Sequence, residues 1–260
     1  MSRLLSTLRL VRVSWFFNLK SLTTSGLFIF TSVIEPVIFA TLAYYLFKAG
    51  NRPGTLLYAS LSAGLMGIWT STLFGSGGSI SFQRWQGVLE PTIASPPPYI
   101  LVLFPATLAS ATIGLYSLTA TLLWGRIVFG IPLHFVHFAA FVLAVLLSIL
   151  ALGALGLVIG SSFVLYRNAN ALSNMLEFPV WIVTGAIVPL SLLPGWVHPL
   201  SWILAPTWGF RAVRAAALGG NPWPSLGWTV LLAAIYLAIG QWFIGVFEVR
   251  ARERATLSLV

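Results

Sequence analysis

Long apolar runs, separated by short polar stretches, make up most of the chain. A helix rises about 1.5 Å per residue, so about 20 apolar residues are needed to cross a hydrocarbon core of roughly 30 Å. Six runs reach this length, and the fourth is long enough to tilt or to extend beyond the bilayer. The pattern predicts six transmembrane helices, at approximately 25–47, 55–78, 99–125, 135–165, 171–193 and 225–247.

The first 22 residues show a different pattern, in which arginines alternate with apolar side chains. Leu4, Leu8, Val11 and Trp15 recur at helical spacing, which predicts an amphipathic helix over 1–22 that lies in the membrane interface. A cleaved signal peptide is the alternative. The apolar run that follows is too long for the core of such a peptide and contains a glutamate, which favours the interfacial helix.

The composition supports a membrane protein and excludes several kinds of site. The chain has 58% hydrophobic and 7% charged residues, whereas soluble domains carry about 25% charged residues. It has no cysteine, which excludes disulfides and thiolate chemistry, and no aspartate. Five scattered glutamates are unsuited to the carboxylate clusters that hold Mg²⁺. We expect one all-α integral membrane domain over 1–260.

The net charge of +9 comes from basic residues at the ends of apolar runs, a placement that orients a membrane protein and requires no nucleic acid. With the N-terminus inside, nine lysines and arginines fall on the cytoplasmic side and five outside. We therefore expect a multi-pass protein of the inner or plasma membrane with both termini in the cytoplasm.

The segment from Pro194 to Gly220 is apolar but too short to span, and prolines interrupt it. Such pieces often re-enter the membrane or lie on it, and a surface loop is the alternative. Its second half, GFRAVRAAALGG, is expected to form a short helix that ends at Gly219 and Gly220.

Two glutamates, Glu35 and Glu177, fall within predicted spans, where carboxylates are costly and often functional. Each lies close to a proline, so the alternatives are a proton relay and a hydrogen-bonded glutamate at a helix bend. Trp69 and Trp181 also lie deep in predicted spans. They either line a substrate path or pack in the core.

Two further motifs are read as structural. The glycine-rich GSGGS at 75–79 lacks the lysine of a phosphate-binding loop, and its glycines are expected to allow close helix packing. His134 and His137 have the spacing of one helix face but no evident third ligand, so we expect no metal site.

A polar stretch, QRWQGVLEPTIASPPP at 83–98, separates the second and third predicted spans. Its apolar residues recur every three to four positions, at Phe82, Trp85, Leu89 and Ile93, while polar residues occupy the other face. This pattern predicts a short amphipathic helix. From the residues alone, the helix either rests on the bilayer or docks onto a partner.

Taken together, these features resemble the permease subunit of type-2 ABC exporters. Glu35-Pro36 is similar to a Glu-Pro of that family, and RWQGVLEPTIASP at 84–96 resembles its intracellular segment. The stretch 174–214 resembles its fifth span and the segment that follows. Val88 and Thr184 depart from the usual threonine and serine, which leaves the subfamily open.

The resemblance implies a non-catalytic subunit of an exporter for drugs or antibiotics, lipids or lipid-linked glycans, and with it a role in multidrug efflux and antibiotic resistance. ATP and Mg²⁺ would be bound by a separate ABC ATPase chain, with no cofactor on this one. A second permease chain, more often identical than different, would complete the pathway. The ATPase would contact a coupling helix that includes Arg84, Trp85, Gln86, Gly87, Val88, Leu89 and Glu90.

By the same resemblance, residues 1–22 correspond to an interface helix and 194–218 to extracellular re-entrant helices. Glu35, Trp69, Glu177 and Trp181 are the residues expected along the substrate pathway. A proton-coupled secondary transporter that uses Glu35 or Glu177 is the alternative function. An intramembrane enzyme would need acid–base or metal residues that converge on one cavity, and the spacing shows none.

Overall fold

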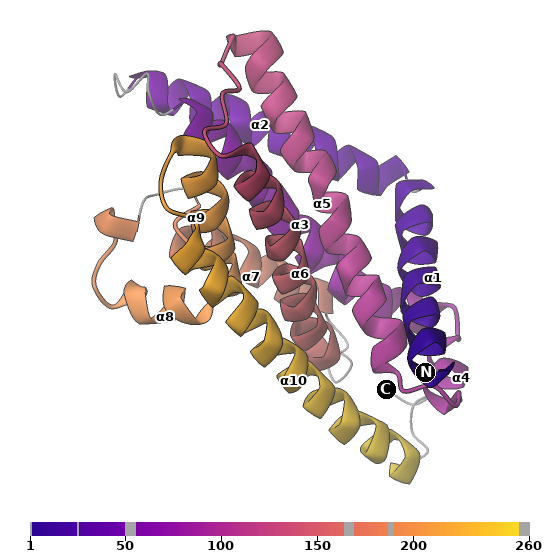
Figure 1. The fold of residues 1–260 in the computed structure, drawn as a ribbon. Helices are drawn as coiled ribbons and strands as arrows, with labels where there is room; N and C mark the ends of the chain where they lie inside the picture. The colour runs from indigo at the N-terminus through magenta and orange to yellow at the C-terminus, as the bar shows by residue number, and fades with distance from the viewer. Residues whose placement is uncertain (1, 25, 50–55, 164–168, 187–189, 255–260) are drawn as a thin grey trace.

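The structure, a computed structural model, describes residues 2–24, 26–49, 56–163, 169–186 and 190–254, and these residues contain helices without strands. The helices, labelled in Figure 1, are α1 (Ser2–Thr24), α2 (Gly26–Ala49), α3 (Leu56–Trp85), α4 (Leu89–Ala94), α5 (Ile100–Phe129), α6 (Phe138–Phe163), α7 (Ala169–Val183), the 3₁₀ turn Leu190–Leu192, α8 (Val197–Ile203), α9 (Ala205–Leu218) and α10 (Trp223–Arg254).

Helices α3, α5 and α6 form the centre of the bundle, and the main hydrophobic core lies between them, α7, α9 and α10. Small residues bring α3 and α5 together. A Cβ atom added at Gly114 would lie 2.5 Å from Cα of Ile68, and one added at Gly64 would lie 2.7 Å from Cα of Leu118. Glycine is therefore required at both positions, since any side chain would push the two backbones apart.

The glycine-rich segment near the end of α3 contributes to this packing at one of its positions. A Cβ atom at Gly75 would overlap the side chain of Ser110 in α5, whereas one at Gly78 would meet nothing within 4 Å. The prediction that these glycines allow close packing is thus confirmed for Gly75 and does not extend to Gly78.

Four helices are long and apolar enough to cross a membrane, namely α3, α5, α6 and α10. The chain is therefore a multi-pass membrane protein, while the six-span topology stays a prediction. In α2 the apolar stretch among the described side chains is Ser32–Tyr45. The helix expected over 171–193 is shorter in the structure, because α7 ends at Val183 and the chain turns at Gly185 with φ +73°.

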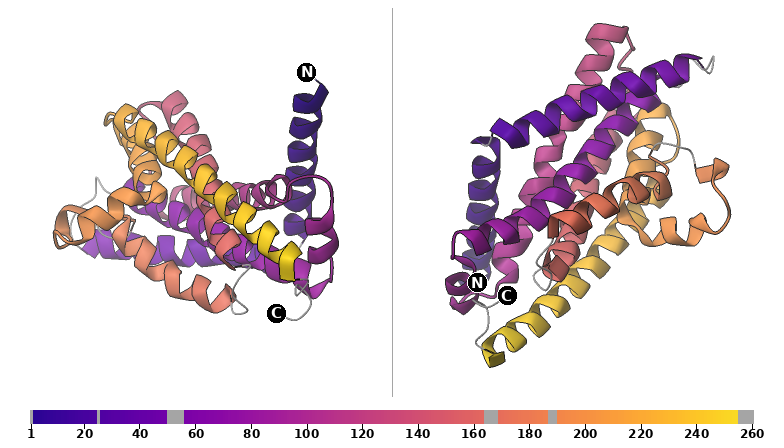
Figure 2. Two further views of the ribbon diagram at one scale, coloured as in Figure 1. Left: turned by 90° about the horizontal axis from the view of Figure 1, so that it is seen from below. Right: turned by 180° about the vertical axis from the view of Figure 1, so that it is seen from behind.

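The ends of the bundle are distinct in Figures 1 and 2. Helix α4 and the Arg254 end of α10 lie at the lower end of the bundle, and α1 begins near the same end, although it stands away from the bundle when seen from below. Lys48 and the Phe129 end of α5 lie at the opposite end. The start of α1 and the end of α10 thus lie at the same end of the bundle as α4, while the cytoplasmic location of the termini stays a prediction.

The segment after α7 forms helices and is not an open surface loop. Helix α9 packs against α6 and α10, and most of its side chains are buried. It ends at Gly219, whose φ of +91° gives the left-handed cap that favours glycine, so the predicted helix end is confirmed. Tyr236 of α10 donates a hydrogen bond to the carbonyl of Ile203, which ties the end of α8 to the bundle.

Candidate functional site

The polar stretch after α3 forms a tight turn followed by a short helix. Helix α3 continues through Trp85, and the chain then turns at Gly87, where φ is +68°. The amides of Gly87 and Val88 donate to the carbonyls of Arg84 and Gln83, which closes the turn. Glycine is favoured here because other residues rarely adopt positive φ.

Helix α4 is held against the lower end of the bundle by two apolar side chains. Leu89 and Ile93 are each 3% exposed and pack in a small core with Ile80, Tyr99 and Leu103. The Tyr99 hydroxyl donates to Oε1 of Gln83 at 3.1 Å, which joins the end of α3 to the start of α5. Pro91 lies in the first turn of α4, where no backbone donor is required.

The outer side of this segment exposes an aromatic surface. Trp85 is 82% exposed and Phe82 is 52% exposed, with their ring centroids 6.1 Å apart, and Gln86, Gly87 and Val88 are exposed beside them. We call Phe82, Trp85, Gln86, Gly87 and Val88 the turn surface. A large exposed tryptophan on a well-anchored turn is typical of a protein contact.

The turn surface differs from the predicted amphipathic helix. The four apolar positions were expected to form one stripe, but the helix breaks at Gly87, so Phe82 and Trp85 face outward while Leu89 and Ile93 face the bundle. Arg84 is half-buried at the end of α3. Glu90 lies in α4, and its side chain is outside the described part of the structure.

A second group of predicted residues comes together where α2, α3 and α7 meet. The Thr70 hydroxyl of α3 donates a 2.8 Å hydrogen bond to Oε1 of Glu177 in α7, and Glu177 is 5% exposed. Glu35 of α2 is half-buried and close enough to Glu177 for the two carboxylates to interact electrostatically. Two glutamates that are 142 positions apart in sequence therefore share one region.

The directions of α2, α3 and α7 explain why Glu35 and Glu177 lie in the same region. Ser32 lies opposite Ser71, and Pro36 lies opposite Gly67, so α2 runs antiparallel to α3. Glu177 contacts Thr70 and the turn after α7 contacts the start of α3, so α7 is also antiparallel to α3. Consequently α2 and α7 run in the same direction, as the ribbon in Figure 2 shows.

Aromatic rings lie one helical turn beyond the glutamates. Trp181 contacts Phe39 of α2 and Phe178 of α7, with both pairs of ring centroids 5.0 Å apart in edge-to-face arrangements. Trp69 and Trp181 are 1% and 2% exposed and belong to the main core. In the single chain these two tryptophans thus pack in the core, which was one of the two alternatives for them.

The outer face of α2 and α7 beside this group is apolar and exposed. We call it the α2–α7 face, and it contains Ile34, Ile38, Leu42, Met175, Phe178 and Ile182. Glu35 lies in the same region and is only half-buried. A half-buried carboxylate beside an apolar face is unfavourable against lipid, so this face is suited to a partner that excludes lipid.

The sequence did not predict the role of Arg214, the most deeply buried cation among the described residues. Its guanidinium donates to the carbonyls of Gly185 and Ala186 at 2.8 and 3.1 Å and to the Ser62 hydroxyl at 2.9 Å, and it lies 4.3 Å from the ring centroid of Tyr58. Burial lowers its pKa to about 10, so the group remains charged at neutral pH. Arg214 thereby joins α9, α3 and the turn after α7.

No three side chains of the types that bind metals gather into one site within the described residues. His134 and His137 lie in the segment between α5 and α6, where the amide of His137 donates to the carbonyl of Ala216. This backbone contact packs the segment against α9.

Residues 9–218 match the family model of the ABC-2 type transporter, which covers more than half of the chain and includes the turn surface, the two glutamates and Arg214. A comparison with curated protein sequences gave no match.

Proposed function

The chain belongs to the ABC-2 type transporter family, and from this membership we propose that it forms the membrane pathway of an ATP-driven exporter whose energy comes from a separate ATPase subunit. The turn surface is the observation that carries the proposal. It offers an exposed aromatic contact at the end of the bundle where α1 begins and α10 ends. A phosphate-binding loop with its lysine does not occur in the printed sequence, which is consistent with the proposed separate ATPase subunit.

The structure suggests how movement would pass from such a subunit into the membrane. Trp85 lies at the end of α3, and α3 is a 30-residue helix that packs against α2, α5, α6 and α7. Leu89 and Ile93 attach the turn to the core at the start of α5. A displacement of the turn surface would therefore act on α3 and α5 together rather than on a loose loop.

In the proposed cycle, ATP binding to the partner moves the turn surface and shifts the permease from an inward-open to an outward-open state. Hydrolysis then resets it. Such coupling requires that the nucleotide-bound partner binds the two states with different affinities, because equal affinities would shift nothing.

We further propose that two copies of the chain enclose the pathway through their α2–α7 faces. A second copy would cover the exposed apolar residues of this face and shield Glu35 from lipid. Half-buried Glu35 and the exposed ring of Phe178 would then border the space between the copies, with buried Glu177 and Trp181 behind them. Such a lining favours amphiphilic cargo, of which drugs, lipids and lipid-linked glycans are the classes that the resemblance implies.

One observation favours a second candidate function. Glu35 and Glu177 interact electrostatically where α2, α3 and α7 meet, and proton-coupled transporters use intramembrane carboxylates for proton relay. A secondary transporter of this kind would operate without an ATPase.

Transport by purified chain in liposomes separates the two functions. The proposed exporter moves substrate only when its ATPase partner and ATP are present, and an uncoupler that abolishes the proton gradient leaves transport unchanged. Transport that continues without the ATPase and stops with the uncoupler would establish the secondary transporter instead.

A further inference from the structure

The two glutamates of α2 and α7 have no basic side chain near them on the three helices that meet there. Helix α7 contains no lysine or arginine, α2 contains only Lys48, and α3 contains only Arg84. Lys48 is 13 residues from Glu35, and Arg84 is 14 residues from Thr70, the donor to Glu177. Each separation corresponds to about 20 Å along the helix. The two carboxyl groups therefore lack an ion-pair partner within α2, α3 and α7.

The buried cation of α9, Arg214, already has other partners. Its guanidinium donates to the carbonyls of Gly185 and Ala186 and to the hydroxyl of Ser62. Ser62 is eight residues from Thr70 in α3, which is about 12 Å along the helix. Carboxylates without a compensating cation are unfavourable in a medium of low dielectric constant, so such a pair either takes up protons or binds a cation from outside the chain.

Aromatic rings lie one helical turn from each carboxyl group. Phe39 follows Glu35 by four residues in α2, and Trp181 follows Glu177 by four residues in α7, so each ring lies on the same side of its helix as the glutamate. Phe39 and Phe178 both contact Trp181, with ring centroids 5.0 Å apart. Phe178 is also 55% exposed on the α2–α7 face. Aromatic rings attract cations and are a common feature of sites for quaternary ammonium ligands.

Two buried polar atoms on the same side of α7 as Glu177 have no hydrogen-bond partner among the described residues. They are Oγ of Ser173, four residues before Glu177, and Nε1 of Trp181, four residues after it. Ser173 is fully buried, and Trp181 is 2% exposed. Because buried polar atoms are usually paired, these two are available to a polar group of a bound ligand or to water. A movement of α7 that exposes them to the pathway breaks no hydrogen bond of either atom.

We propose that the region of Glu35 and Glu177 binds the positively charged group of an amphiphilic organic cation. This inference rests on the proposed function, because the cation would enter the pathway between two copies of the chain at their α2–α7 faces. Half-buried Glu35 meets the charge at this face, and buried Glu177 adds negative charge behind it. Phe178 and the apolar residues of the face contact the rest of the ligand. The proposed cargo thus narrows from amphiphiles in general to those that carry a positive charge.

The test uses two hydrophobic ions of similar shape and opposite charge, tetraphenylphosphonium and tetraphenylborate. Both keep their charge at any pH, so protonation of the glutamates does not by itself favour the cation. Equilibrium dialysis measures the binding of each radiolabelled ion to the full chain in a neutral detergent, with the binding to detergent alone subtracted. The wild type is expected to bind tetraphenylphosphonium about tenfold or more tightly than tetraphenylborate, since unlike charges attract strongly where water is scarce.

Glu35→Gln keeps the size of the side chain and removes its charge, so it should weaken the binding of tetraphenylphosphonium about tenfold or more. Glu248→Gln is the matched control, because it removes one negative charge near the end of α10 and should keep wild-type binding. Equal binding of the cation by these two variants would overturn the proposal, as would equal binding of both ions by the wild type. The comparison of the two ions on the wild type gives the answer if Glu35→Gln does not fold.

Transport in liposomes with the ATPase partner separates this inference from the proposed function. ATP-driven transport of neutral substrates without any transport of tetraphenylphosphonium would overturn the cation site and leave the exporter intact. Binding of tetraphenylphosphonium that depends on Glu35, without ATP-driven transport of any substrate, would support the cation site and overturn the exporter.

Discussion

The hydroxyl of Thr70 in α3 donates a 2.8 Å hydrogen bond to the carboxyl oxygen Oε1 of Glu177 in α7. This contact joins two residues that are 107 positions apart, and Glu177 also interacts electrostatically with Glu35 of α2. It gives a buried carboxyl group a fixed donor, and it fixes the height of α7 against α3. The stability of the region and the arrangement of the proposed pathway therefore depend on the same bond.

Replacing Thr70 by valine should destabilise the chain, because Oε1 of Glu177 loses its donor while the side-chain volume stays nearly the same. We expect the free energy of unfolding to fall by about 1–3 kcal/mol. Thermal unfolding in detergent, followed by tryptophan fluorescence, measures this loss. Thr70→Ser keeps the hydroxyl and should lose clearly less. If valine and serine are tolerated equally, the bond is not a stabilising one.

Arg214 is expected to stabilise the packing of α9 against the turn after α7. Arg214→Gln leaves the carbonyls of Gly185 and Ala186 without their donor, so we expect the free energy of unfolding to fall by about 2–4 kcal/mol. Arg211→Gln serves as control, since Arg211 is exposed and lies 5.3 Å from the ring centroid of Trp208. Similar unfolding temperatures for the two variants would show that the hydrogen bonds of Arg214 do not stabilise the fold.

The contact between α3 and α5 makes a prediction about two glycines. Gly114→Ala places a methyl group against the backbone of Ile68 and should force the helices apart, which lowers the free energy of unfolding by about 1–3 kcal/mol. In Gly78→Ala, also in α3, the added methyl group meets nothing within 4 Å. The free energy of unfolding of this variant should therefore be unchanged or slightly raised. Unfolding temperatures decide between these outcomes, and equal values for both variants would mean that α3 and α5 adjust freely.

The helical character of the chain follows from its sequence, whereas the ends of several helices do not. Long apolar runs predict α3, α5, α6 and α10 because crossing a bilayer requires both length and apolar character. The end of α7 depends on Gly185, whose carbonyl accepts from Arg214, 29 positions later. A local pattern contains no information on such a contact, and the predicted span therefore extended ten residues too far.

The two candidate sites were predictable to different degrees. The stretch at 83–98 could be recognised because polar residues interrupt an apolar sequence, but a single periodic stripe was a poor guide to a helix that breaks at Gly87. Glu35 and Glu177 could be singled out because carboxylates are rare in spans. Their proximity and the donor from Thr70 arise from the packing of three helices, which no spacing along the chain expresses.

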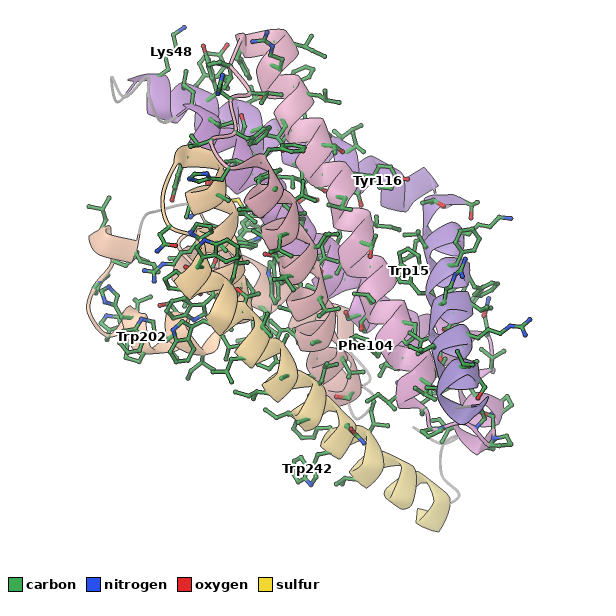
Figure 3. The ribbon with its side chains drawn as sticks, viewed as in Figure 1. Trp15, Lys48, Phe104, Tyr116, Trp202 and Trp242 are labelled. Carbon is green, nitrogen blue, oxygen red and sulfur yellow. The ribbon has the colours of Figure 1, made fainter. Side chains whose placement is uncertain are left out.

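We propose that the turn surface transmits the energy of ATP hydrolysis from an ATPase subunit, and Trp85→Ala removes the most exposed side chain of this surface. Trp85 is 82% exposed, so its removal should leave folding unchanged. In the proposed complex the partner would bury this side chain, and the loss of such an anchor often weakens binding by about 2 kcal/mol or more. Trp242→Ala is the control, because Trp242 is also exposed and projects from α10, as Figure 3 shows.

The measurement is the amount of ATPase subunit that co-purifies with each variant, together with ATP-driven transport in liposomes. Trp85→Ala is expected to lose at least tenfold of both while keeping the wild-type unfolding temperature, and Trp242→Ala is expected to keep wild-type values. Full ATPase binding and full ATP-driven transport by a folded Trp85→Ala variant would contradict the proposed role of the turn surface.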